Sequence, residues 1–411
     1  MIRFIYWLLA FIEMLLVLAV LILFIITDSR SIKYIAETSL DSFGLTYESI
    51  EGNLFNGLEV KKLSYKDKPL FSSALIHWNP LTLFHDKITI TKFDAQGIEL
   101  ENIIAMTNGM KSNKSEGRAS LDFDLILNNT HLDINPYIYE NVKFSSFIFE
   151  TGKIEIDKDL TVNANPLYLK FDSDIVNLKM DAKIKDNRLL VDNLDLKNIS
   201  FQDITKLITR LNLKAKKEKK TKVSSTQKEN KIPLFKDIEV KHVLGTMNAF
   251  KYEGVKVEKS TFNLYKLKVD KDLTVNVNPL YLKFNSNIVN VKLDAKIKDN
   301  RLLVDNLDLK DISLKDITKL TGRLKSKYKK EKKNKTLTQK KENKILFLEN
   351  IKVKHILGTL KAVQYGDLKI EAATLHLYDG VIEPSHNFRY QVKKVEFKGK
   401  TNFGNLDYKG H

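Results

Sequence analysis

The chain has 411 residues, enough for two or three domains of ordinary size. It contains no cysteine, which excludes structural disulfides and thiolate metal sites. Its formal net charge of +17 is concentrated in two lysine-rich segments, 214–231 at +6 and 325–344 at +8, so the rest of the chain is close to neutral and is not a basic nucleic-acid-binding surface.

The first predicted element is a membrane-spanning helix. Phe4–Ile26 is a nearly continuous apolar run, long enough to cross a bilayer core of about 30 Å. No small-residue cleavage site follows it, so it predicts an uncleaved signal anchor within residues 1–30 and an exported C-terminal part. Glu13 is the one charge in the run, and it is either a functional carboxylate or a tolerated, partner-facing group.

Short strands are predicted after the anchor. Ser31–Phe43 has weak helical spacing, and Gly44 is placed to end it. The segments that follow alternate between apolar and polar residues and are separated by Gly and Pro. The predicted strands are Leu45–Ile50, Leu58–Tyr65, Ala74–Trp78, Lys87–Phe93 and Gly97–Leu100.

An internal repeat dominates the remaining sequence. Asp157–Leu211 recurs at Asp270–Leu324, 113 positions later, with 45 of 55 aligned residues identical. A fixed period of this kind is typical of an array whose units present the same surface. We therefore expect one elongated, repetitive array rather than several unrelated domains.

Each repeat predicts antiparallel strands followed by a short helix. Apolar residues occupy every second position from Val176 to Ile184, so they share one face of a strand. Asp186-Asn187 predicts a turn, and Asn165-Pro166 is expected to separate two earlier short strands. Ile204, Leu207, Ile208 and Leu211 then have helical spacing, with Asp203 near the helix start.

The lysine-rich segments follow these helices. They contain one Tyr and no Arg, whereas nucleic-acid-binding segments usually interleave aromatic residues and Arg with Lys. Their composition favours solvated, disordered loops over a contact with nucleic acid or anionic lipid.

The N-terminal region resembles a known family. An apolar anchor and a short helix precede GLTYESIEGNLFNGLEVKKLSY, ALIHWNPLTLF and ITITKFDAQGIEL, and this order is similar to the N-terminal end of AsmA-like proteins, TamB in particular. The resemblance covers roughly residues 1–103. It implies a single-pass protein of the inner membrane, mostly periplasmic, with a β-groove that carries phospholipid acyl chains towards the outer membrane. It implies as an alternative an assembly factor for outer-membrane proteins or autotransporters, with an outer-membrane assembly protein as partner.

The repeat and the resemblance together predict the domain organisation. The predicted regions are an anchor (1–30), an AsmA-like region with a degenerate first unit (31–118), two full units (119–231 and 232–344) and a partial unit (345–411). The predicted fold is mostly β: an antiparallel sheet array curled into a groove, with short amphipathic helices.

No enzymatic, metal or cofactor site is predicted. The sequence lacks GxSxG, P-loop and GxGxxG motifs. His242 and His355 are repeat mates, but no two histidines have the spacing of a metal-ligand pair, so ordinary strand histidines are favoured.

The apolar face of the array needs a cover, because exposed apolar surface costs about 25 cal/mol per Å². A second sheet, the short helices or lipid acyl chains could provide it. Each unit has one short helix for several strands, which favours a lipid-lined groove, with an envelope scaffold or an inert spacer as the other hypotheses. The candidate lining residues are Val162, Leu169, Phe171, Val176, Leu178, Met180, Ala182, Ile184, Leu190, Leu194, Leu196, Val289, Val291, Leu293, Ala295 and Ile297.

Overall fold

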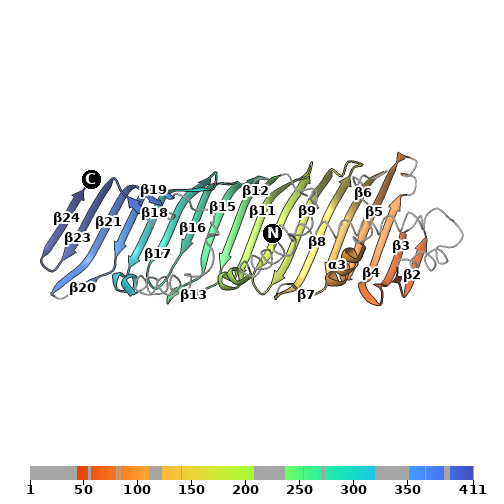
Figure 1. Ribbon diagram of the computed structural model, residues 1–411, viewed down its shortest axis with the longest axis horizontal. Helices are drawn as coiled ribbons and strands as arrows, with labels where there is room; N and C mark the ends of the chain where they lie inside the picture. The colour runs from red at the N-terminus through yellow and green to blue at the C-terminus, as the bar shows by residue number, and fades with distance from the viewer. Residues whose placement is uncertain are drawn as a thin grey trace, which may run out of the picture. The chain divides into compact units, whose positions relative to one another are not determined.

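The structure is a computed structural model that describes residues 44–53, 57–79, 82, 85–110, 123–139, 141–207, 237–252, 254–270, 274–319, 351–365, 367–383 and 389–410. These residues are mostly β-strand, as the alternating patterns predict (Figure 1). The predicted anchor, the lysine-rich segments and the unit boundaries at 118, 231 and 344 lie outside them. Among the described helices, none has the length and apolar character needed to cross a membrane.

The chain divides into two compact units, the first comprising residues 1–194 and 209–238 and the second residues 195–208 and 239–411, and the first division falls inside strand β11, between Leu194 and Asp195. The strands before this point are β1 (Leu45–Thr46), β2 (Ser49–Asn53), β3 (Gly57–Tyr65), β4 (Lys68–Asn79), β5 (Lys87–Ile98), β6 (Asp124–Ile134), β7 (Tyr137–Tyr139), β8 (Val142–Ile156), β9 (Val162–Ser173) and β10 (Asn177–Lys185). Those from it onward are β11 (Arg188–Ile199), β12 (Asp237–Met247), β13 (Phe250–Tyr252), β14 (Val255–Val257), β15 (Ser260–Asp270), β16 (Val275–Phe284), β17 (Asn290–Lys298), β18 (Arg301–Ile312), β19 (Ile351–Leu360), β20 (Val363–Tyr365), β21 (Leu368–Glu383), β22 (Arg389–Gln391), β23 (Lys394–Thr401) and β24 (Gly404–Gly410).

Each unit contains one continuous run of paired strands. In the first unit β3, β4, β5, β6, β8, β9 and β10 pair in that order, with β1 and β2 on β3 and β7 on β8. In the second unit β15, β16, β17, β18, β19, β21, β23 and β24 pair in that order. Strands β20 and β22 pair with β21, and β13 pairs with β14.

The prediction of a purely antiparallel sheet is wrong, because the sheet is mixed. β5 pairs in parallel with β6, and β18 pairs in parallel with β19. Parallel neighbours cannot be joined by a tight hairpin and need a crossover connection. Residues 313–350, which include the second lysine-rich segment, must therefore provide the crossover connection between β18 and β19.

Two of the tight turns between antiparallel strands are formed by Asp-Asn pairs. Asp299 and Asn300 join β17 to β18 with φ of 49° and 62°, and their repeat mates Asp186 and Asn187 have φ of 51° and 61°. Two consecutive left-handed residues match the twist of a two-residue hairpin, and Asp and Asn tolerate this conformation. The predicted turn at Asp186-Asn187 is confirmed.

A row of irregularities crosses the strands of the first unit. It interrupts the apolar alternation at Thr91-Lys92 in β5, Asn128-Asn129 in β6, Gly152-Lys153 in β8 and Asn165-Pro166 in β9. At each dipeptide the alternation slips by one residue, so apolar side chains stay on one face. The second unit repeats the pattern at Asn278-Pro279 in β16 and Asp305-Asn306 in β18.

The prediction that Asn165-Pro166 separates two short strands is wrong. Strand β9 continues through Asn165-Pro166, which therefore does not separate two strands. Proline is tolerated in strands at such bulges, and bulges bend the strand that carries them.

Short helices follow β5, β11 and β18. Helix α3 (Leu100–Met110) lies beside β4, so the predicted strand Gly97–Leu100 is wrong: its first two residues end β5 and its last begins α3 (Figure 1). Helical turns at 201–207 and 314–319 confirm the predicted repeat helix, while Ile208 and Leu211 lie outside the described residues.

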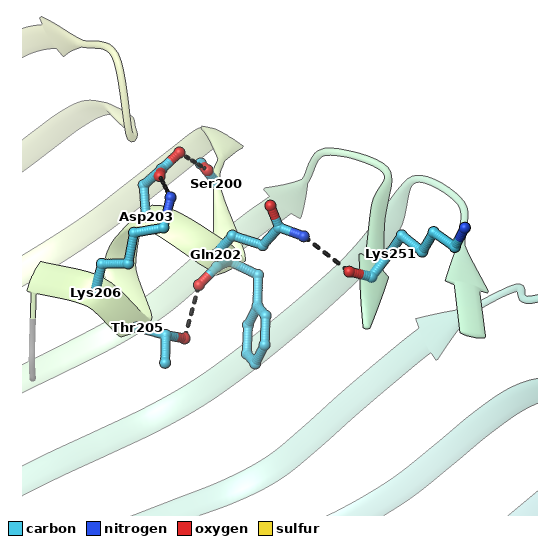
Figure 2. A network of polar contacts seen from close by, with 7 residues as sticks. Ser200, Gln202, Asp203, Thr205, Lys206 and Lys251 are labelled. Carbon is cyan, nitrogen blue, oxygen red and sulfur yellow. Dashed lines mark hydrogen bonds and ion pairs between the residues drawn. The ribbon is translucent and has the colours of Figure 1, made fainter. Parts of the chain in front are cut away.

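Two of these helices start with the same cap. Ser200 Oγ lies 2.5 Å from Asp203 Oδ2, and Ser313 Oγ lies 2.6 Å from Asp316 Oδ2. Figure 2 shows this cap and, beside it, Gln202 donating to the backbone oxygen of Lys251 at 2.8 Å. The cap and this contact fix the helix against the β13 hairpin.

Candidate functional site

The candidate site is the apolar face of the sheet, and it is built from rows of cross-strand neighbours. In the first unit Leu132 lies opposite Ala95 on β5 and Phe149 on β8, and Phe149 lies opposite Leu169 on β9. Parallel to this row run others of the same kind. They are Ile88, Leu125, Ile156 and Val162; Trp78, Ile90, Leu127, Ile154, Ala164 and Ile184; and Ile98, Ile134, Phe147, Phe171 and Leu178.

Most of these first-unit side chains are buried. Leu125, Leu127 and Leu132 are 2% exposed or less. The opposite face is polar: Asp94, His131, Glu150, Tyr168 and Asp181 lie in one row, with His131 Nδ1 3.0 Å from Glu150 Oε1. The sheet therefore has one apolar face and one wet face, as the alternation predicts.

Aromatic rings close one end of the first-unit face. Phe171 lies 6.2 Å from Phe147 and 5.5 Å from Phe144, centroid to centroid, and Tyr137 stacks on Phe144 at 4.6 Å. Burial, with Tyr139 as a second cause, raises the pKa of Tyr137, so its hydroxyl stays neutral. These rings make a rigid apolar end to the rows.

The second unit carries a more open row. It crosses seven strands through Phe262, Leu282, Leu293, Leu307, Ile356, Leu377 and Val395. All seven side chains are only half-buried. The buried core beside the row consists of Ala295, Val304 and Val353, on which Leu293, Leu307 and Ile356 pack.

Two pairs of repeat mates differ in burial between the units. Phe149 and Leu169 are 7% and 5% exposed, whereas their mates Phe262 and Leu282 are half-buried. These two positions therefore have less protein around them in the second unit, while Met180 and Leu194 are half-buried like their mates Leu293 and Leu307. Beside the long sheet, the described residues form one further sheet, the two-stranded pair β13–β14.

The predicted lining residues take several places in these rows. Leu178, Met180, Ala182 and Ile184 lie opposite Phe171, Leu169, Leu167 and Ala164. Their mates Val291, Leu293, Ala295 and Ile297 lie opposite Phe284, Leu282, Leu280 and Val277. Val176 and Val289 precede β10 and β17, and their backbone oxygens accept hydrogen bonds from Ser173 and Ser286.

The position of Leu190 belongs to the other face. Its repeat mate Leu303 lies opposite Lys296 on β17 and Lys352 on β19, whereas Leu302 and Val304 lie opposite Ile297 and Ala295. The cause is the bulge at Asp305-Asn306, which shifts the alternation by one residue. Leu194 and Leu196 are half-buried, and their mates Leu307 and Leu309 lie in the apolar rows.

The sequence reasoning missed the side chains that β5, β6, β8 and β21 add to the face. Each of these strands alternates on both sides of a one-residue slip, and allowing for that slip would have revealed them. Among the described residues, no three His, Asp or Glu side chains converge as metal ligands would. No protein-family model matches the chain, and no curated protein matches its sequence.

Proposed function

We propose that this protein holds phospholipid acyl chains along the apolar rows of its sheet and passes them between membranes of a bacterial envelope. The observation that carries the proposal is the row of seven half-buried apolar side chains across the second unit. Apolar surface of this extent in water needs a partner, and an acyl chain matches both its chemistry and its linear form.

The energetics suit a carrier. Each buried CH₂ contributes about 0.8 kcal/mol, so an acyl chain lying along the row is held by many weak contacts. Such contacts require no specific pocket and let the chain slide from one strand to the next. The bulges at Thr91 in β5 and at Asn165-Pro166 in β9 support a sheet that curls around its apolar face, because bulges bend strands.

The proposed place in the cell rests on the N-terminal sequence. The apolar run Phe4–Ile26 anchors the protein in the inner membrane, with the sheet on the periplasmic side. The resemblance to AsmA-like proteins supports the same place and a role in outer-membrane biogenesis. The anchor brings the sheet close to a source of phospholipid.

The test is the amount of phospholipid that co-purifies with the full chain. We expect the double variant Leu178→Asp with Leu293→Asp, both at half-buried positions, to fold but to lose most of this lipid. The matched control is Lys179→Asp with Lys292→Asp, which places the same charges on the wet face of the same strands. Equal lipid in both variants would contradict the proposal and favour a scaffold that adds client strands to its sheet.

A further inference from the structure

Two histidines on the wet face of the second unit lie within hydrogen-bonding distance of each other. His355 on β19 and His376 on β21 approach to 3.1 Å between Nε2 and Nδ1. Both are half-buried, and their immediate neighbours Ile356 and Leu377 belong to the open apolar row. Because adjacent strand residues face opposite sides, the histidine pair lies on the face away from the apolar rows.

The repeat contains a natural counterpart that lacks the second imidazole. His242 is the mate of His355 and stacks on Tyr265 at 4.7 Å, as His355 stacks on Tyr378 at 5.0 Å. The mate of His376 is Asn263. Within the described part of the chain, His242 Nε2 is buried and has no hydrogen-bond partner. Ring stacking thus occurs in both repeats, and only the later one places a second ring nitrogen against the first.

We propose that His355 and His376 form a binding site for a divalent transition-metal ion such as Zn²⁺ or Ni²⁺. Two imidazole nitrogens bound to one tetrahedral ion at about 2.0–2.1 Å are about 3.3 Å apart, which is close to the separation seen here. Imidazole is a preferred ligand of Zn²⁺, Ni²⁺ and Cu²⁺. Water completes the coordination, because the rings are partly exposed.

Proton positions allow this binding without loss of a proton. In the hydrogen-bonded pair one of the two facing nitrogens carries hydrogen. On metal binding that hydrogen takes the other nitrogen of the same ring, so His355 binds through Nε2 and His376 through Nδ1 as neutral imidazoles. The ion is thus held by two lone pairs from two strands.

The charges around the pair have both signs. Glu396 lies opposite His376 on β23, and its pKa is lowered by a hydrogen bond from Lys394 and by the charges of Lys394, Lys409 and His376. The Glu396 carboxylate therefore stays ionised and favours a cation nearby. Lys394 opposes it, since its Nζ lies 2.7 Å from Glu396 and 5.2 Å from the Tyr378 ring centroid.

The test is calorimetric titration of the full chain with Zn²⁺ and, separately, with Ni²⁺. We expect saturable uptake of one ion per chain. His376→Asn should abolish this uptake, and asparagine is the residue that the repeat already has at the equivalent position, Asn263. His131→Asn is the control, because it removes a wet-face histidine that pairs with a carboxylate instead of a second histidine. This variant should bind as much metal as the unmodified chain does. Unchanged binding in His376→Asn would overturn the proposal.

A gain-of-site variant gives a second, independent test. Asn263→His places an imidazole beside His242, whose Nε2 has no partner among the described residues. We expect uptake to rise from one ion to two, and the additional ion to be lost again when His242→Asn is added. Uptake that stays at one ion would show that the facing-ring geometry does not create a site.

Discussion

Leu293 and Leu307 lie directly opposite each other on β17 and β18, and both are only half-buried. Leu132 and Phe149 form the corresponding kind of pair on β6 and β8, and they are 1% and 7% exposed. The same cross-strand arrangement is thus a closed core at Leu132 and Phe149 and is partly open at Leu293 and Leu307.

This difference in burial predicts that the same substitution, leucine to aspartate, costs much more stability at one position than at the other. Leu132→Asp buries an unpaired carboxylate and should cost about 3–5 kcal/mol, enough to unfold the first unit. Leu293→Asp should lower the melting temperature much less, because its carboxylate can reach water when the row is empty. Thermal unfolding followed by circular dichroism measures both. Equal losses of stability would show that the second-unit row is also a closed core.

The parallel pairing of β18 and β19 sets a limit on shortening the connection between them. Deleting Lys327–Lys341 should leave the melting temperature nearly unchanged, because closing a flexible loop costs little and depends weakly on its length. Replacing residues 313–350 by a two-residue turn should prevent folding, since such a turn joins only antiparallel strands. A folded, stable protein with the two-residue turn would contradict the parallel register.

The break in the alternation of β6 at Asn128-Asn129 predicts a specific backbone requirement at Asn129. Its φ is 47°, and its Nδ2 donates to the backbone oxygen of Thr91 at 3.2 Å. Asn129→Val should cost about 1–2 kcal/mol in the free energy of unfolding, because a β-branched residue is strained in the left-handed region. Asn129→Gly should be tolerated, since glycine adopts this conformation freely. Denaturant unfolding distinguishes the two variants. A valine variant that is more stable than the unmodified chain would show that position 129 does not need the left-handed conformation.

The helix caps predict a local loss of protection. Ser200→Ala and Ser313→Ala each remove the hydroxyl at the helix start and should cost about 1 kcal/mol. We expect faster amide hydrogen exchange at 201–207 or 314–319 and little change in the strands. Thr205→Ala is the control, because it removes a hydroxyl that donates to the backbone oxygen of Phe201 within the same helix. Exchange that is equally fast in the control would show that the caps are not what holds these helices.

Much of the fold could be predicted because apolar and polar residues alternate along most of each strand and the turns use Asp-Asn pairs. Leu178, Met180, Ala182 and Ile184 share a face as their spacing indicates. The repeat helix was also predictable from its change of period.

The parallel strands and the bulges were not predictable in the same way. Nothing in β18 or β19 taken alone specifies that they run in parallel, since the direction depends on how the crossover returns. A proline within a run is typical of a strand break, yet Pro166 sits at a bulge in the middle of β9. The slip at Asp305-Asn306 places Leu303 opposite a lysine, and the strict alternation assumed for its repeat mate Leu190 did not allow for such a slip.

The most direct test of the lipid proposal is photo-crosslinking at neighbouring positions of one strand in living cells. Leu282 lies in the open row of β16, and Lys283 points to the opposite face. With a photoreactive residue at each position in turn, we predict phospholipid adducts by mass spectrometry at position 282 and none at 283. Equal labelling at both positions, or none at 282 in a folded protein, would contradict the account.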